Sequence, residues 1–166
     1  MEESPAAIYV LGVGNLMLAD ESVGVRVVRT LARESWPDDV KLVDAATGGF
    51  GLVDYFAGKG IAVVVDAARM GLEPGDVRVF TPDEVRTRSA EASVSLHDVD
   101  VMTVLNLAAQ LGPIRTIWIV GIEPHTIEVV EALSPALEAR FDEYLDVVRA
   151  LVARIRALGS DESSRL

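Results

Sequence analysis

Short runs of aliphatic and β-branched residues alternate along the chain with longer stretches in which apolar residues recur every three or four positions. The short runs are typical of strands buried in a sheet, and the longer stretches are typical of amphipathic helices. The pattern predicts strands at 8–12, 40–44, 61–66, 76–81 and 116–122. It predicts helices at 23–33, 52–56, 96–111 and from Ser134-Pro135 to Gly159, with a polar loop at 84–93.

This alternation of strands and helices predicts an α/β fold, in which a three-layer α/β/α sandwich is built around a mostly parallel sheet. The strand at 76–81 is expected to lie at an edge of that sheet. No internal repeat or linker interrupts the pattern, and 166 residues suit one compact domain. We therefore expect a single domain over residues 1–159 and a frayed C-terminal tail over residues 160–166.

Composition narrows the class of function. Lys and Arg total 15 against 26 Asp and Glu, and the net charge of −11 argues against binding to nucleic acid. The absence of cysteine excludes disulfides, thiolate metal sites and a cysteine nucleophile. The acidic start of the sequence differs from a secretory signal, and no stretch is long and apolar enough to span a bilayer. We expect a cytoplasmic protein with no membrane insertion.

Polar side chains follow several of the predicted strands. Asp20 and Glu21 come after the first strand, Asp66 ends the third, and His97 opens a predicted helix. Ligands of parallel sheets bind beyond the carboxyl ends of the strands, so these side chains are expected to share one rim. Two carboxylates and an imidazole suit a borderline divalent metal, which makes Glu21, Asp66 and His97 the candidate ligands.

Each of these residues also has a simpler interpretation. An acid before a helix caps free N–H groups, and this suits Asp20 better than Glu21. Ser95 and Asp98 have the spacing of a capping box, which would place His97 in the first turn of a helix. His125 is interpreted as an exposed loop histidine.

A nucleotide-binding alternative rests on Gly12-Val13-Gly14 and on Asp44. The third glycine of a dinucleotide fingerprint is replaced by Met17, and Asp44 lies well beyond the expected position of about twenty residues. A tight strand-to-loop turn is therefore favoured at these glycines. A noncatalytic module that binds a nucleotide or a metal, such as a Rossmann-like binder or a metallochaperone, stays open as the alternative.

The block from Leu11 to Val25, which contains Gly-Asn, then Asp20-Glu21 and Gly24, closely resembles the hydrogenase maturation proteases. The resemblance continues through the segments 44–49, 64–67, 95–97, 121–124 and 133–135, and covers most of residues 8–155. It implies an α/β/α fold with a five-stranded twisted sheet. It also implies an endopeptidase that removes the C-terminal extension of a nickel–iron hydrogenase large-subunit precursor after nickel insertion.

In that family the three metal contacts match Glu21, Asp66 and His97. The resemblance implies that the nickel is carried by the substrate, and that zinc or cadmium can replace it in the isolated protein. The partner is then the large-subunit precursor. The attacking group stays open: Asp66 or Asp44 could act as general base on a water molecule, or the metal could polarise the carbonyl. The loop at Gly48-Gly49 is expected to admit the substrate tail.

Overall fold

The computed structural model describes residues 7–46, 49–88, 95–96 and 101–163. Its centre is a sheet in the strand order β2 (Val40–Ala46), β1 (Ile8–Val13), β3 (Ile61–Arg69), β6 (Thr116–Ile122) and β4 (Val77–Phe80). The first four of these strands are parallel, and β4 pairs antiparallel with β6 at one edge. This confirms the mostly parallel sheet and the edge position expected for residues 76–81.

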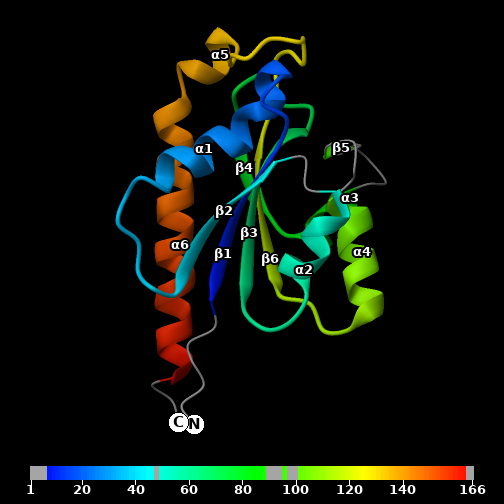
Figure 1. The fold of residues 1–166 in the computed structure, drawn as a ribbon, viewed down its shortest axis with the longest axis vertical. Coiled ribbons are helices and arrows are strands. Elements are labelled where there is room, and N and C mark those ends of the chain that lie inside the picture. The colour runs from blue at the N-terminus through cyan, green and yellow to red at the C-terminus, as the bar shows by residue number, and fades with distance from the viewer. Residues whose placement is uncertain (1–6, 47–48, 89–94, 97–100, 164–166) are drawn as a thin grey trace.

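Helices cover both faces of the sheet (Figure 1). On one face lie α1 (Val23–Leu31) and α6 (Phe141–Ser163), and on the other lie α2 (Leu52–Phe56) and α4 (Val101–Leu111). Strand β3 contributes to both layers, because Val63 and Val65 belong to the apolar cluster under α1 and α6, whereas Val64 belongs to the cluster under α2 and α4. Since successive side chains of a strand point to opposite faces, the uninterrupted apolar run predicts a central strand. The α/β/α fold is therefore confirmed.

Two boundaries near the candidate site differ from the prediction. Ser95 and Leu96 form a short strand, β5, that pairs antiparallel with β3, and the described part of the next helix begins at Val101. A helix that starts at residue 96 is therefore wrong. The Ser95–Asp98 capping box cannot have Ser95 as its cap, and residues 97–100 lie outside the described residues.

The predicted polar loop at 84–93 is also wrong at its start, because Pro82–Arg88 forms helix α3. The carboxylate of Glu84 accepts a hydrogen bond from the backbone N–H of Thr81 (2.6 Å). Thr-Pro-Asp-Glu thus has the sequence of a capping box and makes its Glu84-to-Thr81 bond, with proline at the first helical position. The sequence contains this signal, and the apolar pattern alone missed it.

The last helical region begins at Pro135 as predicted, with Ser134 before it. It is divided, however, into α5 (Pro135–Glu138) and α6. Gly159 lies inside α6, so the predicted stop at this glycine is wrong and the helix includes residues 160–163. Residues 164–166 lie outside the described residues. Among the helices that the structure describes, none combines the length and the apolar character needed to cross a bilayer.

Candidate functional site

The site lies where β2 and β1 end, beside the carboxyl-terminal part of β3, which continues to Arg69. The parallel register places Gly12 of β1 opposite Asp44 of β2 on one side and opposite Val65 of β3 on the other. Asp66 follows Val65 and pairs with Gly121 of β6. The carboxyl ends of four neighbouring strands therefore meet at one rim, as the sequence predicts.

Glycines bring the next segment of chain directly onto this rim. A Cβ atom built on Gly14 would lie 1.9 Å from the carbonyl oxygen of Glu21, and one built on Gly24 would lie 2.1 Å from that of Val65. A Cβ atom on Gly12 would lie 2.5 Å from the carbonyl oxygen of Gly24. No larger residue fits at these three positions. The glycines thus allow the 3-10 helix η1 (Ala19–Ser22) and the start of α1 to rest on the strand ends.

The same distances bear on the nucleotide alternative. Dinucleotide-binding glycines leave space for a pyrophosphate to approach the backbone. Here the space beside Gly12 and Gly14 is filled by the chain's own residues, the backbone of Gly24 and of Glu21. The structure therefore supports the interpretation of Gly12-Val13-Gly14 as a tight turn that permits close packing.

Two of the predicted metal contacts are brought to this point. Asp66 is fully buried, with 0% of its surface exposed and both carboxylate oxygens shielded from solvent. Glu21 is half-buried, and its Oε2 atom is also shielded. Burial disfavours a carboxylate unless a cation or hydrogen-bond donors compensate for the lost water. The prediction that Asp66 ends its strand is wrong, because β3 continues to Arg69. A buried acid in the carboxyl-terminal part of a central strand is still suited to hold a cation or to exchange a proton.

The third predicted contact, His97, lies outside the described residues. The residue before it in the sequence, Leu96 of β5, pairs with Ala68, which lies two residues beyond Asp66 on β3. Within the ranges that the structure describes, no group of three or more histidine or acidic side chains is arranged to hold a metal ion.

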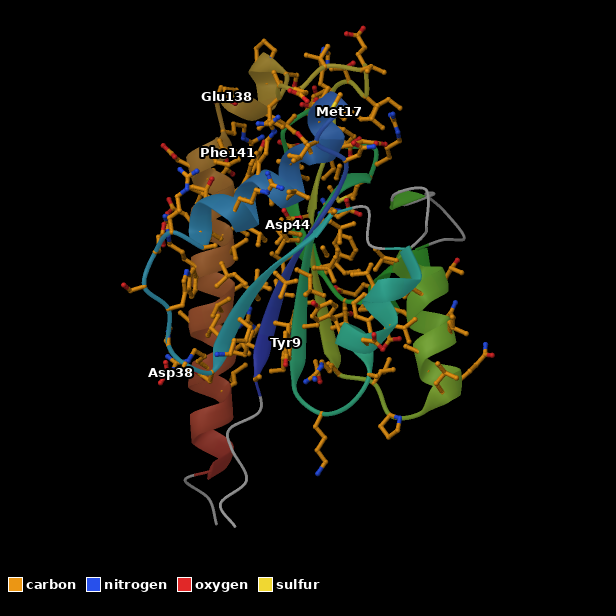
Figure 2. The ribbon with its side chains drawn as sticks, viewed as in Figure 1. Tyr9, Met17, Asp38, Asp44, Glu138 and Phe141 are labelled. Carbon is orange, nitrogen blue, oxygen red and sulfur yellow. The ribbon has the colours of Figure 1, made fainter. Side chains whose placement is uncertain are left out.

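Asp44 lies at the end of β2 but on the other face of the sheet from Asp66 (Figure 2 labels Asp44). Asp44 is in register with Gly12 and Val65, and Val65 belongs to the apolar cluster under α1, so Asp44 faces the α1 layer. Because successive side chains of a strand point to opposite faces, Asp66 faces the layer of α2 and α4. Its Oδ2 atom accepts a hydrogen bond from Nε of Arg29 (2.6 Å), and its Oδ1 atom accepts one from the N–H of Ala46 (3.0 Å). The two candidate bases, Asp44 and Asp66, therefore lie on opposite faces of the sheet.

Of the two glycines expected to admit the substrate tail, Gly48 lies outside the described residues. Gly49 opens the short 3-10 helix η2 (Gly49–Gly51) with a positive φ of 53°. The space in which its Cβ would stand is open. A positive φ favours glycine, so the local backbone conformation accounts for the glycine at position 49.

Asp20 has a role that the sequence does not reveal. Its carboxylate is fully buried and does not cap its own helix. Instead Oδ2 accepts hydrogen bonds from the N–H groups of His125 (2.9 Å) and Thr126 (3.0 Å), and Oδ1 accepts one from Ser134 (2.7 Å). Asp20 therefore joins η1 to the segment that follows β6. No local pattern could identify these partners, because they lie more than a hundred residues away.

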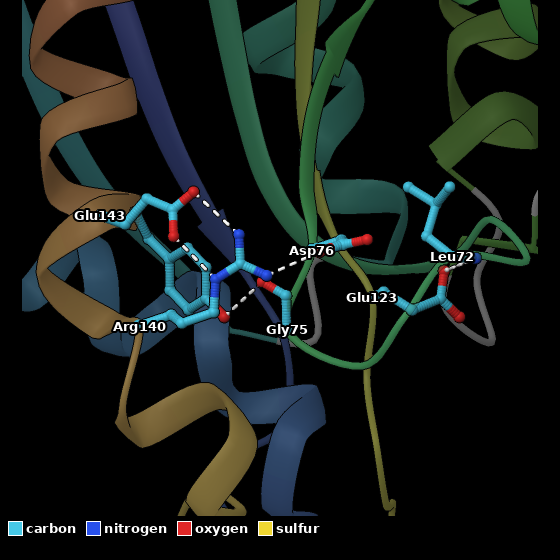
Figure 3. Close-up of polar contacts among 7 residues, drawn as sticks. Leu72, Gly75, Asp76, Glu123, Arg140 and Glu143 are labelled. Carbon is cyan, nitrogen blue, oxygen red and sulfur yellow. Dashed lines mark hydrogen bonds and ion pairs between the residues drawn. The ribbon is translucent and has the colours of Figure 1, made fainter.

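His125 is exposed, as predicted, and lines an open groove of about 510 Å³ beside η1. Directly after β6, the carboxylate of Glu123 accepts hydrogen bonds from the N–H groups of Met70 (2.6 Å) and Leu72 (3.3 Å). Figure 3 shows the bond to Leu72. Glu123 thus fixes the loop that leaves β3. It is a structural acid near the rim, which the sequence analysis did not single out.

An ion-pair network holds the start of α6 against the β3–β4 loop (Figure 3). The guanidinium of Arg140 donates to Asp76 (2.6 Å) and to both carboxylate oxygens of Glu143 (2.7 and 2.9 Å). This contact lowers the pKa of Glu143. Beneath it, the hydroxyl of Tyr144 donates to the carbonyl of Gly75 (2.7 Å), and burial raises the pKa of Tyr144 to about 12.

The chain is similar to proteins of one known family. A family model described as hydrogenase maturation protease matches residues 25–150. The chain is 36% identical to hydrogenase expression/formation protein HupM of Azotobacter chroococcum over 156 residues, which is 92% of this chain and 75% of the relative. It is 32% identical to the hydrogenase 2 maturation protease of Escherichia coli, covering 86% and 88% of the two chains.

The fold is similar to that of the hydrogenase maturating endopeptidase HybD from E. coli. The TM-score is 0.76 at 30% identity, over 89% of this chain and 93% of the other.

Proposed function

Since this chain belongs to the hydrogenase maturation protease family and is an endopeptidase, we propose that it removes the C-terminal extension of a nickel–iron hydrogenase large-subunit precursor after nickel insertion. We place this reaction in the cytoplasm, as expected from the sequence. The observation that carries the proposal is the fully buried carboxylate of Asp66, three residues before the end of β3 and on the strand that contacts the 3-10 helix bearing Glu21.

The nickel belongs to the substrate and serves as the recognition element. Glu21, Asp66 and His97 contact it and thereby position the scissile peptide bond on the rim. The burial of Asp66 supports this assignment, because a cation offsets the cost of a buried carboxylate. Oxygen and nitrogen donors without any cysteine suit a transient contact, since no thiolate of this chain competes for the metal.

In the hydrolytic step a water oxygen attacks the scissile carbonyl carbon, and the departing amine receives a proton. Asp66 is the general base of this proposal: it accepts the proton of the attacking water and returns one to the amine. Asp44 is the weaker candidate, because its carboxylate lies on the opposite face and accepts a hydrogen bond from Arg29. Nickel can also polarise the carbonyl from the substrate side.

The test uses purified precursor with and without nickel, and follows loss of the tail by mass spectrometry. The wild-type protein is expected to cut only the nickel-loaded precursor. Glu21→Gln, Asp66→Asn and His97→Ala are each expected to reduce the rate by at least about a hundredfold. Asp38→Asn, at an exposed acid on the opposite end of the sheet (Figure 2), is the matched control and should cut normally.

Equal cutting of nickel-free and nickel-loaded precursor would contradict the recognition role of the metal. Full activity of Asp66→Asn would contradict its role as base. Thermal unfolding of each variant, compared with the wild type, separates loss of chemistry from loss of fold.

A further inference from the structure

An exposed apolar surface lies beside the 3-10 helix that carries Glu21. It comprises Met17, Ile127, Val129 and Val130, whose side chains are 49%, 45%, 77% and 49% exposed, and we call these four residues the rim patch. The two segments that supply them lie side by side, because Leu18 forms a parallel bridge with Val130. Figure 2 shows Met17 at the end of the molecule where the strands finish. Clustered exposed apolar side chains mark interaction surfaces more often than isolated ones do.

The groove of about 510 Å³ adjoins this patch. Its lining includes Ala19 of η1, His125, Glu128 and Val130 of the segment after β6, and Pro135 of α5. Ala19 is two residues from Glu21 within the same 3-10 helix. A chain that occupies the groove therefore also lies close to the 3-10 helix that carries Glu21, one of the proposed metal contacts.

The backbone around the rim patch is held in place by several hydrogen bonds, of which the one between Asp20 and Ser134 is buried. Asp20 accepts three N–H groups from the segment 125–134, and Nη2 of Arg26 donates to the carbonyl of Glu131 (2.9 Å). The N–H of Ala19 donates to the carbonyl of Val130 (2.8 Å). A surface ordered before binding loses little conformational entropy when a partner binds.

The charge around the patch indicates what kind of partner it fits. Glu128 and Glu131 are exposed on the same segment, and the sequence contains no Lys or Arg between Arg115 and Arg140. The nearby guanidinium of Arg26 already donates to the carbonyl of Glu131 and to the hydroxyl of Ser22. The chain as a whole carries a net charge of −11. An apolar segment flanked by lysine or arginine would complement this surface.

Resting on the proposed function, we propose that the rim patch and its groove bind an apolar, basic-flanked segment of the hydrogenase large-subunit precursor. The contact aligns the precursor with Glu21 and Asp66 and adds affinity that the small nickel site alone does not supply. Its position beside η1 favours the substrate over a second copy of this chain, whose own surface here is acidic.

The test is the double substitution Ile127→Asp and Val129→Asp, compared with Leu111→Asp. Leu111 is 71% exposed, similar to Val129, but ends α4 at the opposite end of the sheet (Figure 1). With nickel-loaded precursor, the double variant is expected to raise KM about tenfold or more with kcat unchanged. Leu111→Asp should leave both unchanged.

A charge reversal tests the chemistry of the partner. Glu128→Lys with Glu131→Lys should raise KM about tenfold, and this effect should shrink as sodium chloride is added. Binding of purified precursor is measured in parallel by titration, so that the docking inference is tested even if no cutting occurs. Failure of the wild type to cut a precursor that it binds would count against the proposed function only.

Equal binding by the wild type and the double variant would overturn the inference. It would also be overturned if sedimentation showed a wild-type dimer that the double variant converts to a monomer with unchanged KM. Both outcomes are interpreted only with variants whose thermal unfolding matches that of Leu111→Asp.

Discussion

Gly14 lies directly against the backbone of Glu21, so that a Cβ atom at position 14 would stand 1.9 Å from the Glu21 carbonyl oxygen. The backbone at Gly14 also has a φ of 147°, which side chains rarely adopt. The position of a proposed nickel contact thus depends on the absence of a side chain seven residues earlier. The glycine-rich turn acts through packing and not through a bound phosphate.

Gly14→Ala is expected to displace η1 and to reduce cutting of the nickel-loaded precursor about a hundredfold. The reason is that a shift of about 1 Å in a positioning group costs a large part of the rate. Steady-state cleavage kinetics measure the effect, and Gly51→Ala, where no atom lies within 4 Å of the added Cβ, is the control. Cleavage kinetics of Gly14→Ala equal to those of the wild type would show that the function of Glu21 does not depend on the close packing at Gly14.

Asp44→Asn and Asp66→Asn distinguish the two candidate bases. Asp44 faces the α1 layer and pairs with Arg29, so its amide variant should keep cutting within about tenfold of the wild type. Asp66→Asn should lose between about a hundredfold and ten-thousandfold, as expected for removal of a general base. Single-turnover cleavage assays measure both, and the reverse order of the two losses would assign the base to Asp44.

Asp20→Ala is expected to destabilise the protein by about 3 kcal/mol, because three backbone N–H groups lose a buried charged acceptor. The midpoint of urea denaturation should fall with the slope unchanged. Asp38→Ala, at an exposed position, should change the free energy of unfolding by less than about 0.5 kcal/mol. A similar small change in Asp20→Ala would show that water replaces the carboxylate.

Tyr144 makes stability depend on pH in the alkaline range. Its pKa is raised to about 12 in the folded protein from about 10 in the unfolded chain, because burial disfavours the phenolate. The folded state therefore keeps this contribution below about pH 10 and loses it as the pH rises through about 12. In denaturant titrations, the wild type should lose stability between these values relative to Tyr144→Phe.

At neutral pH the same Tyr144→Phe variant should be less stable than the wild type by about 1 kcal/mol, since the hydroxyl bond to the carbonyl of Gly75 is lost. A stability difference that stays constant up to pH 12 would contradict the raised pKa of Tyr144.

Gly159→Ala is expected to stabilise the protein by about 0.5–1 kcal/mol. Gly159 lies inside α6, the added Cβ atom would meet no neighbour within 4 Å, and alanine is the better helix former. Thermal unfolding should show a higher midpoint with unchanged cleavage kinetics. A lower midpoint would mean that residues 160–163 are not helical in solution.

The apolar pattern was enough to place the central strands and the layer order. The run from Ala62 to Val65 is apolar and fully buried at every position, as expected only for a strand covered on both faces. The apolar pattern does not capture local polar signals. The capping box at Thr81 and Glu84 is present in the sequence and begins α3, and Gly159 does not stop α6, because glycine only weakens a helix.

The sequence by itself determined the α/β alternation, the rim at the strand ends and the presence there of Asp66, because these depend on periodicity and on local order along the chain. Only the tertiary structure decided that Asp44 and Asp66 face different layers, and that Asp20 binds the N–H groups of His125, Thr126 and Ser134. Such contacts join residues more than a hundred positions apart. Their partners are set by how the sheet brings distant loops together, which no local pattern records.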